Sequence, residues 1–241
     1  MPTPQLHIGR FKIEMYYLAV LVGFFLACLW LVLSALFWTH DLTYGFILFG
    51  ATLISCYTFN VVKQFVSESP EYSIYHYFLM LAVVGWICSF WFGRNLALTM
   101  DLFLMSFSIA AASGRLGCYH AGCCFGKKGF PTQIAESGFH ALNFIGGIVL
   151  LRFVEPGFTA LVLATSYAVF RFWIEFLRAD ERPYLWGISE AQFTASAILI
   201  VLSLISLFHY SDWWIPMAFI TVFQNVVLLW VLAKSFRKRT I

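Results

Sequence analysis

Residues 114 to 129 read GRLGCYHAGCCFGKKG, with one arginine, one histidine, three cysteines and five glycines between two long apolar runs. The glycines and Arg115 together predict an anion site. A glycine-rich turn lets backbone amides approach an anion closely, and a guanidinium group forks onto phosphate oxygens. The stretch therefore favours a ligand that carries phosphate.

The cysteines of the same stretch offer two other kinds of chemistry. Cys118, His120, Cys123 and Cys124 supply four nitrogen or sulfur donors, the number that tetrahedral zinc takes. Adjacent cysteines rarely both ligate one zinc and the usual paired spacing is missing, so no metal site is predicted. Thiol and disulfide exchange is the other alternative, although a disulfide between adjacent cysteines closes a strained ring.

A second set of charged residues lies in SYAVFRFWIEFLRADERP. Arg171, Glu175 and Arg178 stand at i, i+4 and i+7, which predicts that all three share one face of a helix. Two arginines with one carboxylate leave a positive charge that an anionic ligand would neutralise. The alternative is a structural ion pair together with an arginine that extends toward the membrane surface.

The segment PTQIAESGFHALNFIGG shows a similar polar face. Gln133, Glu136, His140 and Asn143 are spaced by three, four and three residues, so a helix places them on one side. Hydrogen bonding between membrane helices would explain the same pattern. Asp101, in LALTMDLFLMS, is a lone carboxylate for which we expect an arginine partner.

Composition identifies the elements that must position these residues. Apolar residues make up 61% of the chain and charged residues 11%, with a mean hydropathy of +0.81, which predicts an all-α, polytopic transmembrane helical bundle. We expect one integral membrane domain over residues 1–241. The net charge of +3 gives no support to nucleic-acid binding. The predicted spans are 15–38, 44–65, 73–92, 96–113, 133–153, 158–178, 188–208 and 213–233.

The motifs together resemble a known family. GRLGCYHAGCCFG is similar to the signature of the bacterial prolipoprotein diacylglyceryl transferases, and FPTQIAES, FRFWIEFLRADERP, ISEAQF and MYYLAVLVGF resemble further segments of that family in the same order. The resemblance covers about residues 13–208 and implies seven family-like spans. The eighth span, 213–233, lies beyond it.

The resemblance implies transfer of a diacylglyceryl group from phosphatidylglycerol to an acceptor thiol in the bacterial inner membrane. The acceptor would be a lipoprotein cysteine or a smaller thiol, the other product would be glycerol phosphate, and neither a metal nor a cofactor is implied. Carried over by motif, the catalytic residues are Arg115, Arg171, His76 and Tyr16. The substrate-binding residues are Gly114, Gly117, Cys118, Gly126, Gln133, Glu136, Glu175 and Arg178.

Several positions depart from the family pattern. Cys118 stands where the signature has asparagine and Cys123 where it has an acid, and His76 lacks the two glycines that follow the family's catalytic histidine. Two alternatives therefore stay open. One is a membrane thiol redox protein that uses Cys118, Cys123 and Cys124; the other is a non-catalytic phospholipid-binding protein on the same scaffold.

The orientation in the membrane has two conflicting predictions. The family resemblance implies an active site on the extracytoplasmic side. In the eight-span arrangement, however, most basic residues fall on the side of the Arg115 segment, and the positive-inside bias makes that side cytoplasmic. Those residues are Arg10, Lys12, Lys63, Lys127, Lys128, Arg182 and the basic tail, against Arg94 and Arg152 on the other side.

Overall fold

The computed structural model describes residues 5–8, 11–66, 74–179, 184–185, 188–210 and 212–237, and these are mostly helical. They form two compact units. The first unit comprises Met1–Ala121 with Glu136–Ala160, and the second comprises Gly122–Ala135 with Leu161–Ile241. The helix α5 begins in the second unit and continues in the first.

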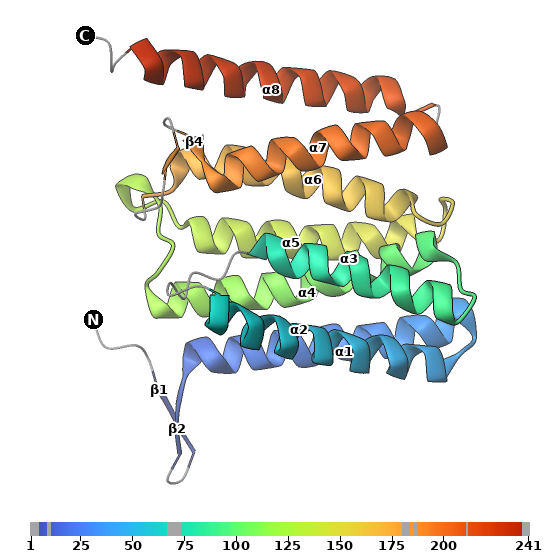
Figure 1. Ribbon diagram of the computed structural model, residues 1–241. Coiled ribbons are helices and arrows are strands. Elements are labelled where there is room, and N and C mark those ends of the chain that lie inside the picture. Colours follow the sequence, from blue (N-terminus) through green and yellow to red (C-terminus); the bar gives the residue numbers. More distant parts are fainter. Residues whose placement is uncertain are drawn as a thin grey trace. The chain divides into compact units, whose positions relative to one another are not determined.

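The first unit is built from antiparallel helices that follow one another along the chain (Figure 1). A two-stranded hairpin, which the sequence did not predict, precedes them: β1 (Gln5–Ile8) pairs with β2 (Phe11–Glu14). The helices are α1 (Met15–Thr39), α2 (Leu42–Val66), α3 (Ile74–Trp91), α4 (Leu96–Ala121) and α5 (Thr132–Leu150).

The second unit holds three further long helices, two single-turn helices and two short strands. A single-turn helix, η1 (Lys127–Gly129), lies between α4 and α5. Another, η2 (Glu175–Leu177), follows α6 (Phe158–Ile174). The strands β3 (Tyr184–Leu185) and β4 (Ile188–Ser189) pair before α7 (Glu190–His209), and α8 (Trp214–Arg237) comes last.

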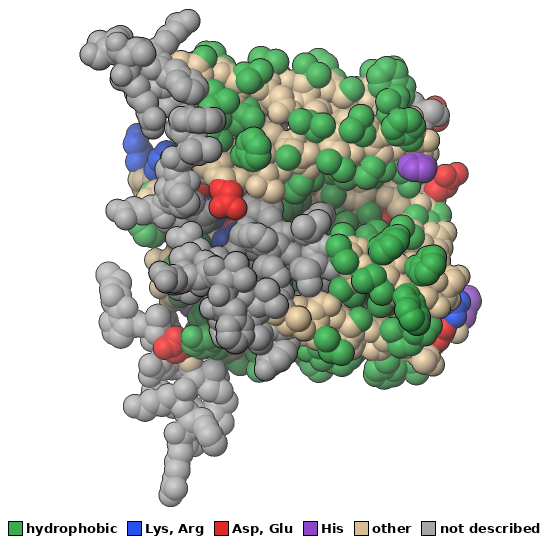
Figure 2. All heavy atoms as spheres, in the orientation of Figure 1, with side chains coloured by type: hydrophobic (Ala, Val, Ile, Leu, Met, Phe, Trp, Pro, Cys, Tyr) green, Lys and Arg blue, Asp and Glu red, His purple; other side chains and the backbone are tan. Residues whose placement is uncertain are grey.

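Each unit has its own apolar core, and many large apolar side chains stay exposed, as expected of helices that face lipid. Figure 2 shows hydrophobic side chains along the length of the helices, with charged side chains mostly toward the helix ends. The core residues are Leu31, Ala35, Tyr44, Leu48, Val84, Cys88, Leu102 and Phe103 in the first unit, and Ala168, Phe172, Ile188, Ala195, Leu199 and Leu228 in the second.

The expectation of an all-α membrane bundle agrees with the length and polarity of the helices. Five described helices are long and apolar enough to cross a membrane, and shorter apolar stretches occur within α2 and α3. The count of seven or eight spans stays a prediction. The five are Met15–Thr39, Leu96–Ala121, Phe158–Leu177, Glu190–His209 and Trp214–Lys234.

Small residues allow α1 and α4 to approach each other closely, as is common between membrane helices. A Cβ atom at Gly23 would lie 2.5 Å from the Ser113 Cβ atom, and the Ser113 hydroxyl donates a 2.6 Å hydrogen bond to the Ala19 carbonyl. One turn further along α4, a Cβ atom at Gly117 would lie 3.1 Å from the Tyr16 carbonyl oxygen. This packing holds the first turn of α1 against the last turns of α4.

The turn between α1 and α2 lies at the end of α1 far from Tyr16 and is fixed by Asp41. The Asp41 carboxylate accepts a 3.0 Å hydrogen bond from the Tyr44 amide, as a helix-capping residue does, and it pairs with Arg94. The amide of Tyr44, with a further contribution from the Arg94 guanidinium, holds the pKa of the Asp41 carboxyl below its usual range. The cap is therefore ionised at neutral pH.

Asp101 does not have the partner that the sequence predicted. Its two oxygen atoms accept 2.6 Å hydrogen bonds from the backbone amides of Gly157 and Ala160, at the start of α6. The expectation of an arginine partner is corrected, because the amides that a helix start leaves without an intrahelical partner can stabilise a buried carboxylate. Asp101 thereby fixes the connection from α5 into α6.

We expect Asp101→Ala to lower the free energy of unfolding by about 2–3 kcal/mol, because two buried amides lose a charged acceptor. Chemical denaturation in detergent micelles measures this change. The isosteric variant Asp101→Asn keeps one oxygen acceptor and is expected to lose less. A variant Asp101→Ala that unfolds at the denaturant concentration of the wild type would contradict the assignment.

Candidate functional site

The glycine-rich stretch begins as helix rather than as a turn. Gly114, Arg115 and Gly117 all lie in the last two turns of α4, which continues to Ala121. Their backbone amides therefore serve the helix, and the prediction that these amides approach an anion is corrected. Gly117 is needed where α1 packs closely at Tyr16, whereas a Cβ atom at Gly114 would meet no atom within 4 Å.

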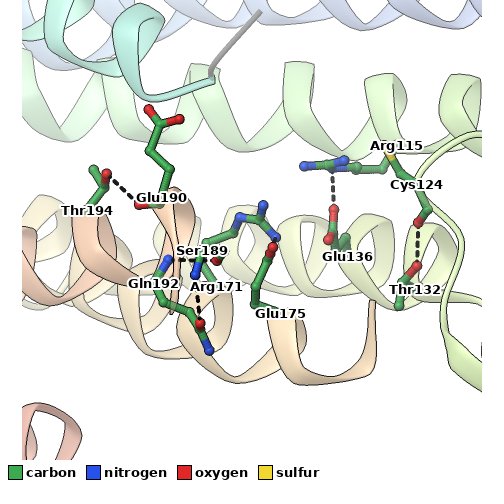
Figure 3. A network of polar contacts seen from close by, with 10 residues as sticks. All are labelled: Arg115, Cys124, Thr132, Glu136, Arg171, Glu175, Ser189, Glu190, Gln192 and Thr194. Carbon is green, nitrogen blue, oxygen red and sulfur yellow. Dashed lines mark hydrogen bonds and ion pairs between the residues drawn. The ribbon is translucent and has the colours of Figure 1, made fainter. Parts of the chain in front are cut away.

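Arg115 makes an ion pair with Glu136 of α5 within the first unit (Figure 3). The Glu136 side chain is 3% exposed and that of Arg115 is 12% exposed. Next to Glu136, the Ser137 hydroxyl donates a 2.8 Å hydrogen bond to the Ala112 carbonyl, which ties α5 to α4 one turn before Arg115. Two charges held this far from water are costly unless each is compensated.

The predicted polar face of α5 is buried. Gln133, Glu136 and His140 are each at most 5% exposed, and Asn143 is half-buried. His140 packs edge-on against the rings of Phe107 and Phe139. A polar face that is buried along a membrane helix serves either interhelical contacts or a ligand.

In the second unit, α6 ends with the ion pair between Arg171 and Glu175 (Figure 3). The Arg171 Nη1 atom lies 3.0 Å from the Glu175 Oε2 atom, and both side chains are at most 4% exposed. The ion pair that the sequence analysis gave as an alternative is therefore present between these two residues, at the i, i+4 spacing of one helical face.

Arg178 does not continue the helical face that the spacing predicted. The helix α6 ends before Glu175 and is followed by η2, after which Arg178 has extended backbone angles, with φ −76° and ψ 147°. Its backbone forms an antiparallel bridge with Gly126. This pairing with a distant segment overrides the local helical pattern, yet the Arg178 side chain is still buried, with 1% exposed.

The connection between α4 and α5 is held against the end of α6. The Ala179 amide donates a 3.0 Å hydrogen bond to the Phe125 carbonyl, and the Lys127 ammonium donates a 2.9 Å bond to the Phe176 carbonyl. Lys127 is exposed, and its ammonium group thereby caps a carbonyl of η2 that follows the end of α6.

The other side of this connection is held by the start of α5. The Thr132 hydroxyl donates a 2.6 Å hydrogen bond to the Cys124 carbonyl (Figure 3). The Gln133 side-chain amide donates a 2.6 Å bond to the Cys123 carbonyl. Sequence reasoning did not identify Thr132, whose position after Pro131 at a helix start was the only available signal.

Gly126 is closely surrounded by backbone and side-chain atoms of the second unit, which leave no room for a side chain. A Cβ atom there would overlap the Phe130 carbonyl oxygen and would lie 2.8 Å from Thr132 Cγ2 and 3.1 Å from the Leu177 carbonyl oxygen. We therefore expect Gly126→Ala to destabilise the protein by about 1–3 kcal/mol through overpacking, measured by thermal unfolding in detergent.

Gly114→Ala is the matched control for Gly126→Ala. The added methyl group at residue 114 would meet no atom within 4 Å, and alanine favours a helix interior by about 1 kcal/mol over glycine. We expect this variant to keep or raise the unfolding temperature. Equal losses in both variants would show that Gly126 has no special packing role.

The remaining predicted site residues lie on several elements. Tyr16 is half-buried in the first turn of α1, and Cys118 is half-buried in the last turn of α4. In the following connection, Cys123 is exposed and Cys124 is half-buried. His76 lies in the first turn of α3, but its side chain is outside the described residues.

Comparison with known proteins gives one family. The family model described as prolipoprotein diacylglyceryl transferase matches residues 4–209. These residues include both ion pairs, Gly126 and Arg178.

Three curated relatives carry related names. "Phosphatidylglycerol--prolipoprotein diacylglyceryl transferase 2" of Clostridium perfringens is 31% identical over 138 residues, which are 47% of this chain and 53% of the relative. A transferase of Clostridium tetani is 29% identical over 126 residues, 42% and 49% of the two chains. One of Dehalococcoides mccartyi is 28% identical over 145 residues, 51% and 55% of the two chains.

The chain spans about half the length of the curated relatives it matches. The family model, by contrast, covers most of the chain. This protein therefore belongs to the prolipoprotein diacylglyceryl transferase family.

Proposed function

We propose that this chain transfers a diacylglyceryl group from phosphatidylglycerol to an acceptor thiol, as a single integral membrane domain of the bacterial inner membrane. The acceptor is the cysteine of a lipoprotein precursor or a smaller thiol. The observation that carries the proposal is the burial of two arginines, one in the last turn of α6 and one just after η2. Arg171 and Arg178 are 3% and 1% exposed, respectively.

These two arginines suit a phosphate ligand. Among the described residues of the second unit, the buried charged side chains are Arg171, Arg178 and Glu175. A phosphate accepts the paired hydrogen bonds of a planar guanidinium group, and it carries negative charge opposite to that of the arginine. At a membrane, the head group of phosphatidylglycerol supplies such a phosphate.

The proposed reaction is an S-alkylation. The acceptor thiolate attacks the glyceryl carbon that is bonded to the phosphate oxygen, a C–S bond forms, and the C–O bond breaks. Glycerol phosphate leaves with the electron pair of that bond. Negative charge grows on the leaving phosphate, and preorganised guanidinium groups in a water-poor site stabilise this charge more in the transition state than in the ground state.

In the first unit, Arg115 is proposed as a donor-lipid contact, with Glu136 holding its guanidinium group. Glu175 does the same for Arg171. His76 is proposed to accept the proton of the acceptor thiol, since histidine titrates near neutral pH. Tyr16, Cys118, Gly126 and Gln133 complete the proposed substrate contacts.

The test is release of the head group. Purified chain in detergent is incubated with phosphatidylglycerol labelled in its glycerol phosphate, with a peptide carrying a lipoprotein cysteine, with a small thiol, or with neither. We expect thiol-dependent release of labelled glycerol phosphate, and phosphatidylethanolamine as the donor control should give none. The responding thiol identifies the acceptor class.

If no glycerol phosphate is released, two further measurements distinguish the alternative functions. Donor lipid that binds without release would favour the non-catalytic phospholipid-binding protein. Thiols that react with an alkylating reagent only after reduction would favour the thiol redox protein. Either result, without release of glycerol phosphate, would contradict the proposed transfer.

A further inference from the structure

The adjacent cysteines 123 and 124 have a geometry that their sequence spacing does not suggest. Side chains of neighbouring residues in an extended chain point to opposite sides. Here the two sulfur atoms lie within 4.8 Å of one another. The cause is the backbone of Cys124, whose φ of +59° lies in the left-handed region and turns the chain sharply.

This turn is held firmly on its backbone side. The carbonyl groups of Cys123 and Cys124 accept the 2.6 Å hydrogen bonds from Gln133 and Thr132. Both donors are buried, at 5% and 0% exposed. A residue other than glycine adopts a left-handed conformation only at an energetic cost, so the surrounding contacts must maintain it.

The thiol side is accessible. Cys123 is exposed and Cys124 is half-buried, so an ion can reach the pair without opening the fold. Two thiolates on tetrahedral zinc lie about 3.8 Å apart, since each Zn–S bond is about 2.3 Å long. The observed spacing therefore needs only small side-chain rotations to hold one ion between the two sulfur atoms.

We propose that Cys123 and Cys124 bind a thiophilic d10 cation, Zn²⁺ or Cu⁺. Thiolates are soft ligands, and they select these ions over Mg²⁺ or Ca²⁺, which prefer oxygen ligands. The two thiols release their protons to solvent on binding, and the cation undergoes no change in oxidation state. This site is independent of the transfer activity proposed above.

The site is joined through the backbone to the arginines at the end of α6. Gly126 follows Cys124 by two residues and pairs with Arg178, and the Phe125 carbonyl accepts the hydrogen bond from Ala179. An ion that fixes Cys123 and Cys124 also restrains this backbone pairing. Cation binding is therefore expected to slow the exchange of the Ala179 amide hydrogen with solvent.

The test measures ion binding by the full chain in detergent, under reducing and anaerobic conditions, against a chromophoric chelator. One arm uses Zn²⁺ and the other Cu⁺. We expect one ion per chain, and at least about a hundredfold weaker binding in Cys123→Ser and Cys124→Ser, because each removes a thiolate ligand. Tight binding in a single arm identifies the ion.

Two controls separate ligand loss from misfolding. Cys124→Gly removes the thiol but suits the left-handed backbone, so it is expected to lose binding and to keep the unfolding temperature. Cys88→Ala removes a buried thiol of α3 and should leave binding unchanged. Equal affinity of the wild type and Cys124→Gly for both ions would overturn the proposal.

Discussion

Replacing Arg171 with glutamine is expected to lower kcat/KM for diacylglyceryl transfer by about a thousandfold, which is the cost of losing one preorganised donor to a developing oxyanion. Arg171 is buried at the end of α6 and holds its guanidinium group 3.0 Å from Glu175. The glutamine variant keeps hydrogen-bond donors but no charge. Release of labelled glycerol phosphate from phosphatidylglycerol, followed over time, gives the rate.

Two further variants separate chemistry from folding. Arg171→Lys keeps the charge but loses the paired hydrogen-bond donors of the planar guanidinium group, and we expect kcat/KM to fall by about a hundredfold. In Arg171→Gln, the buried Glu175 carboxylate loses its ion pair with residue 171, which lowers the unfolding temperature. The double variant with Glu175→Gln removes both charges. We expect it to restore the unfolding temperature without restoring the rate. A single variant Arg171→Gln that keeps activity within tenfold of the wild type would contradict the assignment.

Replacing Arg115 with alanine is expected to produce two losses. Because Glu136 stays buried, the free energy of unfolding should fall by about 3–5 kcal/mol, the usual cost of removing one partner of a buried ion pair. The rate of transfer should fall by about a hundredfold or more, because Arg115 is also assigned to the donor phosphate. Denaturation in detergent and the head-group assay measure the two effects separately.

The double variant Arg115→Met with Glu136→Leu tests which of the two roles matters. Apolar residues of similar volume often replace a buried ion pair with little loss of stability. We therefore expect this variant to be folded and inactive. Recovery of both stability and activity would show that Arg115 serves packing alone.

The elements could be located from the sequence because apolar runs set their length. The spans predicted at 15–38 and 44–65 correspond to α1 (Met15–Thr39) and α2 (Leu42–Val66). The exception is α4, which was predicted to end at residue 113 but continues to Ala121. Glycine was taken there as a sign of a turn, whereas Gly117 serves close packing against Tyr16.

The tertiary pairing at the site could not be predicted from local spacing. Arg178 follows Arg171 by seven residues, which fits one face of a helix, but its backbone pairs with Gly126 and leaves the helix. Asp101 has no local sign that the amides of Gly157 and Ala160 would be its partners. Both arrangements depend on segments that are distant in sequence, and periodicity carries no information about such contacts.

The central claim is that this chain forms a C–S bond between a thiol and a diacylglyceryl group. Its most direct test is the intact mass of a peptide with one lipoprotein-type cysteine after incubation with purified chain and phosphatidylglycerol. A mass gain of one diacylglyceryl group on that cysteine, absent with Arg171→Gln, is the predicted result. An unchanged peptide mass, with no thioether formed on a small thiol acceptor either, would contradict the claim.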